Sequence, residues 1–432
     1  MFIAGNNSLI KNTTYKVVLP FYGYAALSFL VATILMFSNT AIFTQHYFHP
    51  HTLAITHTMA LGWGTMIILG ASHQLFPVLI EGKLYSNLLA YLSFIFAAMG
   101  IPMLVFAFYK FDMGWIATTG ATFINLAIAS FLVNLWLSMS SDKTQNVYTV
   151  FAFTAVLWLF TTTLLGLLLI WNFTLHLFSK DSVHYLSLHA HLGIIGWFLI
   201  MIIGVGSRLI PMFLISKYEN KKQLWWVYAL INIGLMSLIV LFFLASNPRL
   251  YFIPFTLIGL GVGLFGKYIY WSFVQRIRKK VDTQVKISIL SVAFILLSIM
   301  VLGVVITLYA TAADTQLILL YGFTIFFGWI TTIILGMTFK TLPFIIWNKV
   351  YSNIAGLGKT PNPKDLFSDS VFLANGIAYL LGYVAFSMGI IQSNVLVLNV
   401  GTIFLLISAV LYNFNIFKIL FHKAKQHGNK DK

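Results

Sequence analysis

Three histidines lie near the start of two long apolar stretches of the chain. His57 is in one of these stretches, and His189 and His191 are together in a second. Imidazole ligates heme iron, copper and zinc, and an ionisable side chain in so apolar a segment is costly, which favours a function for it. The chain has no cysteine, so thiolate ligands are excluded. No carboxylate lies inside the same two stretches, so heme iron or copper is favoured over a hard cation.

These histidines belong to a motif that recurs three times, and an internal repeat shapes the whole interpretation of a sequence. The first copy contains His57, Gly62-Trp63, Gly70, Pro77 and Lys83. The other two copies keep this spacing: His191, Gly196-Trp197, Gly204, Pro211 and Lys217, and then Phe323, Gly328-Trp329, Gly336, Pro343 and Lys349. The pattern predicts three structural repeats, at about residues 17–139, 147–275 and 287–417. The leading position is His, His and Phe, so a ligand is expected there in two copies only.

The two histidines of the second copy stand two residues apart. On a straight helix such residues project about 200° from each other, so one ion cannot easily take both. We therefore expect His57 and His191, which share the repeat position, to be the main ligand candidates, with His189 as a ligand on the second face. The alternative is that each histidine only hydrogen-bonds a neighbouring carbonyl or hydroxyl group.

Other histidines are weaker metal-binding candidates. Four of them lie on the predicted outer side of the membrane: His46, His49, His51 and His184. Clustered histidines can bind a metal, and they can equally be solvated loop residues beside interfacial aromatic side chains. His73 follows His57 at a distance of about 24 Å along a helix, so the two cannot share a site. We expect His73 near the opposite membrane interface.

Composition defines the environment of these residues. Of the whole chain, 59% is hydrophobic and 8% is charged, against about 25% charged in soluble domains. This predicts an all-α integral membrane protein. Twelve apolar runs are long enough to span a bilayer as helices: residues 17–39, 52–80, 87–108, 114–137, 147–171, 185–215, 224–245, 252–273, 287–310, 317–346, 371–391 and 395–417. We therefore expect a single transmembrane domain over residues 1–432, with four helices in each repeat.

Charge predicts the orientation of the chain. The formal net charge is +16, and lysine and arginine concentrate in the loops on one side. By the positive-inside rule both termini are cytoplasmic, and residues 418–432 form a basic cytoplasmic tail. The lipid bilayer, and not nucleic acid, then accounts for the basicity. Arg208 and Lys340, near helix ends, are expected to extend toward lipid headgroups. Residues 1–16 show no pattern of a removable signal peptide.

Two stretches carry a resemblance to a known family. They are residues 57–77, HTMALGWGTMIILGASHQLFP, and residues 189–211, HAHLGIIGWFLIMIIGVGSRLIP. With twelve predicted helices in three repeats, the chain resembles the catalytic subunit I of heme-copper oxidases. It is most similar to the short, divergent members related to the nitric-oxide-response heme-copper proteins. The resemblance implies a pseudo-threefold helix bundle in the bacterial cytoplasmic (inner) membrane, heme b held by histidine, and an outer-face electron donor such as a c-type cytochrome subunit.

The chain departs from the family pattern at the metal centre. Family oxidases carry histidines on the seventh and tenth helices, and neither predicted helix has one here. The predicted spans also lack the carboxylates that proton pumps use. We therefore expect a reduced metal set, with heme b and copper as the candidate cofactors, bound by a rearranged histidine pair across the second and sixth helices. The expected function is electron transfer, or binding or reduction of a diatomic gas such as NO or O2. The alternative is a non-redox transporter or an accessory factor for metal or heme handling or oxidase assembly, in which the outer histidines would matter more.

Overall fold

The computed structural model describes residues 14–80, 82–139, 146–245, 247–309, 315–353, 355 and 360–424. Within these residues the chain is helical and has no strand, apart from an isolated β-bridge between Ser216 and Arg276. Twelve helices in this part of the chain are long and apolar enough to cross a membrane, which confirms the number of spans predicted from the sequence. Most of the predicted basic tail, from residue 425 onward, lies outside the described residues.

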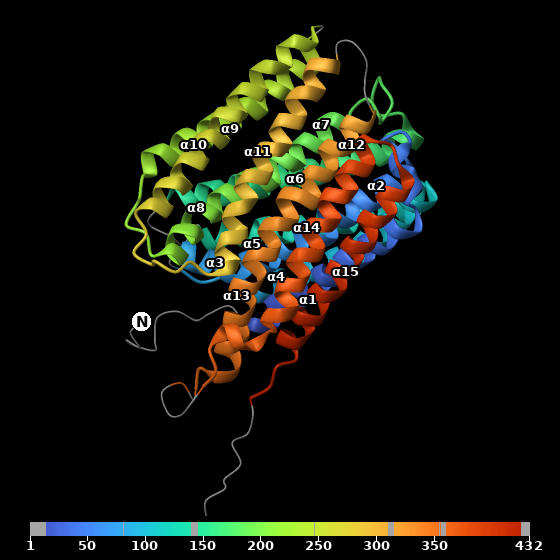
Figure 1. The fold of residues 1–432 in the computed structure, drawn as a ribbon. Coiled ribbons are helices and arrows are strands. Elements are labelled where there is room, and N and C mark those ends of the chain that lie inside the picture. The colour runs from blue at the N-terminus through green and yellow to red at the C-terminus, as the bar shows by residue number, and fades with distance from the viewer. Residues whose placement is uncertain are drawn as a thin grey trace, which may run out of the picture.

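The twelve spans form a bundle of long, roughly aligned helices (Figure 1). Nine spans each contain one α-helix: α1 (Tyr15–Ser38), α4 (Asn87–Lys110), α5 (Trp115–Met139), α6 (Val147–Leu175), α9 (Lys221–Leu244), α10 (Phe252–Val274), α11 (Thr283–Tyr309), α14 (Asp369–Ile391) and α15 (Val395–Leu420). The other three spans are each built of three pieces: α2 (Pro50–His57), η2 (Thr58–Thr65) and α3 (Met66–Leu79); α7 (Leu186–His191), η3 (Leu192–Leu199) and α8 (Ile200–Leu214); α12 (Thr315–Phe323), η5 (Thr324–Ile330) and α13 (Thr331–Tyr351). Three short 3₁₀ helices flank the spans: η1 (Thr40–Thr44), η4 (Pro248–Tyr251) and η6 (Pro363–Leu366).

Each of the three composite spans has a π-helical middle piece. The π-helix starts directly after the leading residue of the repeated motif: η2 follows His57, η3 follows His191, and η5 follows Phe323. Such segments are rare and occur mostly as short interruptions of α-helices, frequently at functional sites. The repeated sequence motif thus adopts the same irregular backbone in all three places.

Two hydrogen bonds join the three composite spans at or next to their π-helical pieces. The indole Nε1 of Trp63 donates to Oγ1 of Thr331 at 3.1 Å, and that of Trp197 donates to Oγ1 of Thr65 at 3.0 Å. Both tryptophans are almost completely buried, and a buried indole N–H needs an acceptor. The tryptophan of one copy therefore bonds a threonine that stands two residues after the tryptophan of another copy.

The third contact among these pieces is aromatic. The rings of Phe198 in η3 and Phe326 in η5 lie edge to face with centroids 6.3 Å apart. A Cβ added to Gly64 in η2 would stand 2.7 Å from Cε1 of Phe198, so only glycine allows this approach. All three π-helical pieces therefore meet one another near the middle of the bundle.

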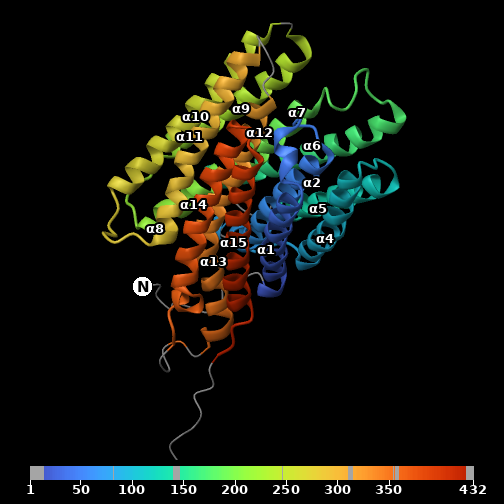
Figure 2. The same ribbon diagram turned by 45° about the vertical axis from the view of Figure 1, so that its right-hand side comes forward.

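The first and last spans pack side by side, as both ribbon views show (Figures 1 and 2). Nδ2 of Asn413 in α15 donates to the carbonyl oxygen of Ala26 in α1 at 2.8 Å, and a Cβ at Gly23 would lie 3.6 Å from Leu420. The helices α9, α10 and α11 run along one flank of the bundle in the same two views. The two ends of the described chain are thereby joined by direct helix packing.

Charged side chains near the helix ends find protein partners. Lys340 in α13 forms an ion pair with Asp282, just before α11. The same carboxylate accepts a hydrogen bond from Arg278 at 2.8 Å. Arg208 lies over the ring of Tyr148, with its guanidinium carbon 5.7 Å from the centroid. The prediction that Lys340 extends to lipid headgroups missed this pairing, because Asp282 lies 58 residues earlier in the chain, before a different helix.

Candidate functional site

His57 is the last residue of α2, at the point where the π-helix begins. Its Nδ1 lies 2.9 Å from the carbonyl oxygen of Leu53, and since a carbonyl only accepts, Nδ1–H is the donor. In the neutral ring this leaves Nε2 with a free lone pair. The ring also packs on Phe108, with centroids 4.6 Å apart. The helix thus fixes the tautomer of His57 and leaves one nitrogen available to a ligand.

His189 faces His57 across the bundle interior. Their ring centroids are 6.3 Å apart and the ring planes differ by 19°. Nδ1 of His189 is buried and has no hydrogen-bond partner, which carries the desolvation cost of an unsatisfied polar atom. The ring lies close to α6, where a Cβ at Gly166 would be 3.0 Å from Cε1. The structure therefore brings His57 close to His189, whereas the sequence indicated His57 and His191 as the main candidates and His189 as the ligand on the second face. Metal binding by these residues stays a prediction.

The distance between the two ring centroids would allow one metal ion to be held between the two imidazoles. An ion at about 2 Å from each of two nitrogens would hold the rings at a separation comparable with the observed one. A metal-ligating histidine usually donates a hydrogen bond from its other ring N–H, often to a backbone carbonyl. His57 makes such a bond from Nδ1–H to the carbonyl of Leu53. Within the described residues, no group of three or more His, Cys, Asp or Glu side chains could hold a metal. The chain therefore offers two ligands to such an ion from this set.

His191 points to a different neighbour. Its Nδ1 lies 2.7 Å from the carbonyl oxygen of Ser187, and its Nε2 lies 3.4 Å from the hydroxyl of Tyr321 in α12. The two rings are stacked, with centroids 5.9 Å apart. Both nitrogens of His191 thus have a polar neighbour. A role for Tyr321 was not assigned from the sequence, although its position matches that of His189 when the second and third motif copies are aligned.

The third motif copy builds an aromatic cluster at the leading position. Phe323 is buried and stacks on Phe327, Tyr383 and Phe386, with centroids 5.0, 5.5 and 4.6 Å away. This copy holds no imidazole, as expected from its sequence.

The outer histidines make local contacts. Nδ1 of His46 accepts a hydrogen bond from the backbone of Phe48 at 3.2 Å, and Nδ1 of His49 caps α2 by accepting from the backbone of His51 at 3.2 Å. His51 lies within α2 and stacks on Tyr109 at 4.1 Å. His184 packs against Tyr185 and Phe242. These contacts belong to helix capping and aromatic packing, and metal binding by these four residues stays a prediction.

His73 is buried among aromatic side chains. Its side chain is 0% exposed and lies between Phe21 and Phe131, with centroids 5.3 and 5.1 Å away. Nδ1 bonds the carbonyl of Leu69 at 2.7 Å. The position of His73 near the opposite membrane interface stays a prediction, and the structure adds that its side chain is covered by neighbouring residues.

Comparison with the models of known protein families finds no match, and comparison with the sequences of curated proteins finds none either.

Proposed function

We propose that this chain is a multi-pass heme protein of the bacterial cytoplasmic membrane, in which His57 and His189 hold one heme b iron. Its role is electron transfer, or the binding or reduction of a diatomic gas such as NO or O2. The observation that carries the proposal is the pair of facing imidazoles on two different spans. One of them has a nitrogen left free by a backbone bond, and the other has a buried nitrogen without a partner.

The small number of protein ligands favours heme over a bare ion. Zinc sites take three or four protein ligands, whereas heme iron needs at most two axial ligands because the macrocycle supplies the rest. Two histidines are what this site provides within the described residues. Copper is the second candidate, with the remaining ligands coming from a bound molecule. When bound, heme would supply a one-electron redox centre, and a diatomic molecule would bind its iron only when one of the two histidines has left it.

The chain's own residues would orient the cofactor and a nearby proton. The Leu53 carbonyl keeps the proton of His57 on Nδ1, so Nε2 stays available for the metal. The Ser187 carbonyl does the same for His191, which leaves its Nε2 to accept from the Tyr321 hydroxyl. We assign His191 the role of holding this hydroxyl, and it remains the alternative ligand if Tyr321 turns away.

The resemblance to subunit I of heme-copper oxidases supports the same proposal and limits it. A complete heme–copper centre would need further histidines in the seventh and tenth spans, and these spans contain none. The proposal is thus a divergent member with a reduced metal set. An electron donor such as a c-type cytochrome would come from a partner, because a chain without cysteine cannot attach heme covalently through the Cys-x-x-Cys-His motif.

The test is a reduced-minus-oxidised visible spectrum of the purified protein, with heme stoichiometry measured by pyridine hemochrome. We expect a b-type signal that is lost in both His57→Ala and His189→Ala. The matched control is His73→Gln in the same span as His57, since His73 makes the same backbone bond; this variant should keep the signal. His191→Ala should also keep it.

Two outcomes would change the assignment. Loss of heme in His191→Ala with retention in His189→Ala would make His57 and His191 the ligands. Absence of heme from the wild-type protein, when heme is supplied during expression, would favour the non-redox alternative: a transporter or an accessory factor for metal or heme handling or oxidase assembly.

A further inference from the structure

Two loops at one end of the flanking helices pair with each other. The first follows α8 and contains Ile215 and Lys217, and the second follows α10 and contains Arg276 and Ile277. An antiparallel β-bridge pairs Ser216 with Arg276, and the backbone N–H of Ile277 donates to the carbonyl oxygen of Ile215 at 3.0 Å. Both loops lie at the end of the flank where α9 and α11 begin (Figure 2). We call the paired residues 215–217 and 275–280 the two-loop surface.

The two-loop surface carries an excess of positive charge. The carboxylates next to it are engaged by other cations. Glu219 pairs with Lys221, and Asp282 pairs with both Arg278 and Lys340. Four cations of the surface form no ion pair within the described residues: Lys217, Arg276, Lys279 and Lys280. The surface is therefore complementary in charge to an anionic ligand.

Arg276 is held in place with part of its guanidinium unused. Its guanidinium carbon lies 3.9 Å from the centroid of the Phe273 ring, and one Nη–H donates to the carbonyl oxygen of Phe273 at 2.7 Å. Its Nε is buried and has no hydrogen-bond partner. A guanidinium offers several N–H groups in a planar fork that matches the oxygens of a phosphate. Arg276 is thus positioned by Phe273 and still lacks an acceptor of this kind.

Apolar side chains stand directly beside these cations. Ile215 and Ile277 are 54% and 56% exposed. Ile215 has a φ of 50°, which is unfavourable for a β-branched residue and typical of functional positions rather than of unconstrained loops. Tyr270 and Trp271 are exposed in the last turns of α10, and such aromatic residues are enriched at the membrane–water boundary. Exposed isoleucines among free cations suit a surface in the headgroup region of a bilayer, whereas they would contribute nothing to binding a free phosphate.

We propose that the two-loop surface binds one anionic phospholipid of the phosphatidylglycerol class. The Arg276 fork binds the phosphate, and Lys217, Lys279 and Lys280 supply further positive charge around it. Ile215 and Ile277 contact the upper part of the acyl chains. This lipid site is separate from the histidines and does not depend on the proposed heme.

The experiment uses the purified full-length protein, delipidated in a nonionic detergent and titrated with dioleoylphosphatidylglycerol. Native mass spectrometry counts the bound lipid. We expect saturable binding in the wild type and about fivefold weaker binding in Arg276→Gln, which is the contribution of one basic residue near a lipid surface. The matched control is Arg249→Gln, which removes the same charge from the exposed segment η4 before α10 and should leave the affinity unchanged.

Three results would overturn the lipid site. One is equal affinity in Arg276→Gln and Arg249→Gln. Another is equally tight binding of dioleoylphosphatidylcholine, which would remove the preference for an anion. The third is displacement of the lipid by an equal concentration of inorganic phosphate, which would make this a site for free phosphate. Circular dichroism verifies folding. If Arg276→Gln folds poorly without its contact to Phe273, the double variant Lys279→Gln/Lys280→Gln of two exposed lysines should weaken binding at least fivefold.

The apolar part of the site has its own readout. Ile277→Ser should weaken phosphatidylglycerol binding at least twofold, because the acyl chains lose an apolar contact. The control is Ile253→Ser, since Ile253 is similarly exposed near the other end of α10 and this variant should bind the lipid as the wild type does. The same affinity in both variants would refute the contact with the acyl chains.

Discussion

At the scale of single residues, the helix backbone determines which histidine nitrogen is available. His57 and His191 each donate Nδ1–H to the carbonyl four residues earlier, so their difference lies in what faces Nε2. His57 stands opposite another imidazole, and His191 faces the Tyr321 hydroxyl. The repeat position shared by the two histidines could be found in the sequence. Their different neighbours depend on which spans pack together, and this information is not local in the chain.

The Trp63–Thr331 bond provides a test at the same scale. Replacing Thr331 with Val should lower the free energy of unfolding by about 1–3 kcal/mol, because the buried Trp63 N–H loses its acceptor. Thermal unfolding in detergent measures the change. The matched double variant Trp63→Phe/Thr331→Val removes donor and acceptor together and should be less destabilised than the sum of the two single variants. An additive double variant would contradict a direct contribution from this bond.

At the scale of elements, the sequence predicted the spans well and their irregularities poorly. Long apolar runs predicted all twelve helices, because the requirement to cross a bilayer is strong and local. The π-helical pieces η2, η3 and η5 left no signal that hydropathy could detect, although the recurring Gly-Trp motif marked their places. The ion pair of Lys340 and Asp282 was missed because it joins the middle of α13 to the residue before α11, far away in the chain.

This ion pair should contribute more than an exposed one. In Asp282→Asn the half-buried Lys340 and Arg278 lose their shared carboxylate, and we expect a loss of about 1–3 kcal/mol in stability. The control is Glu219→Gln, which breaks the exposed pair with Lys221 and should change stability by less than about 1 kcal/mol. Both variants are compared by thermal unfolding at low and high salt. Equal stability of the two variants would contradict a structural role for Asp282.

At the scale of the whole molecule, the bundle has two ends with different charge. Lys217, Arg276 and Arg278 lie in loops that contact each other through the bridge of Ser216 and Arg276 and the bond from the Arg278 N–H to Leu214, at 3.4 Å. The composition of the chain predicted a basic side, and the structure shows that two of its loops form one surface. Which side of the membrane this surface faces remains a prediction from the positive-inside rule.

The absence of cysteine makes that orientation directly measurable. In Lys217→Cys and Arg249→Cys, each variant carries a single thiol in an exposed loop. A membrane-impermeant maleimide added to intact cells should label residue 249, on the outer side, and should label residue 217 only after the cells are opened. The reversed labelling pattern would overturn the predicted orientation and place the histidine pair toward the cytoplasm.

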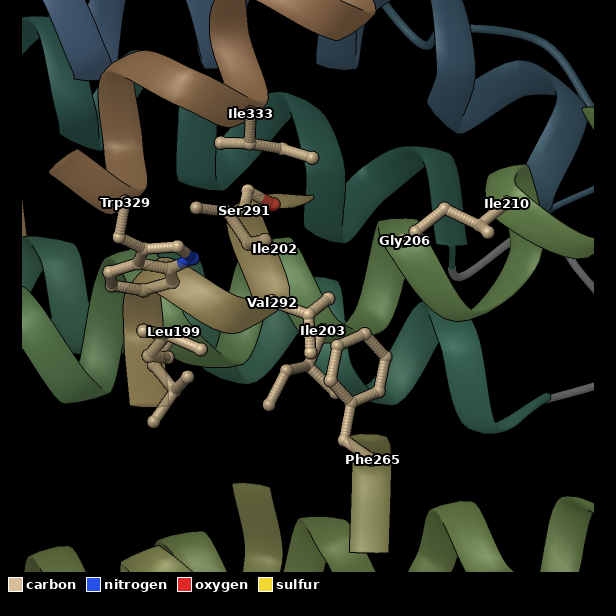
Figure 3. A pocket seen from close by; sticks show the side chains of 11 residues that line it. Leu199, Ile202, Ile203, Gly206, Ile210, Phe265, Ser291, Val292, Trp329 and Ile333 are labelled. Atoms are coloured by element: carbon tan, nitrogen blue, oxygen red, sulfur yellow. The ribbon is translucent and has the colours of Figure 1, made fainter. Parts of the chain in front are cut away.

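The two tryptophan–threonine bonds among the π-helical pieces have a mechanical consequence. They join η2 to the first residue of α13, directly after η5, and η2 to η3. Between η3 and η5, the described residues show the Phe198–Phe326 ring contact and no tryptophan–threonine bond. Three helix segments that are joined by two such hydrogen bonds should separate most easily at the third interface, where no such bond is present. Thermal fluctuations of the bundle should therefore be largest at the interface between η3 and η5, where Leu199 and Trp329 line a common cavity (Figure 3). Leu199, which stands where the other two motif copies have threonine, would thus determine which interface opens first.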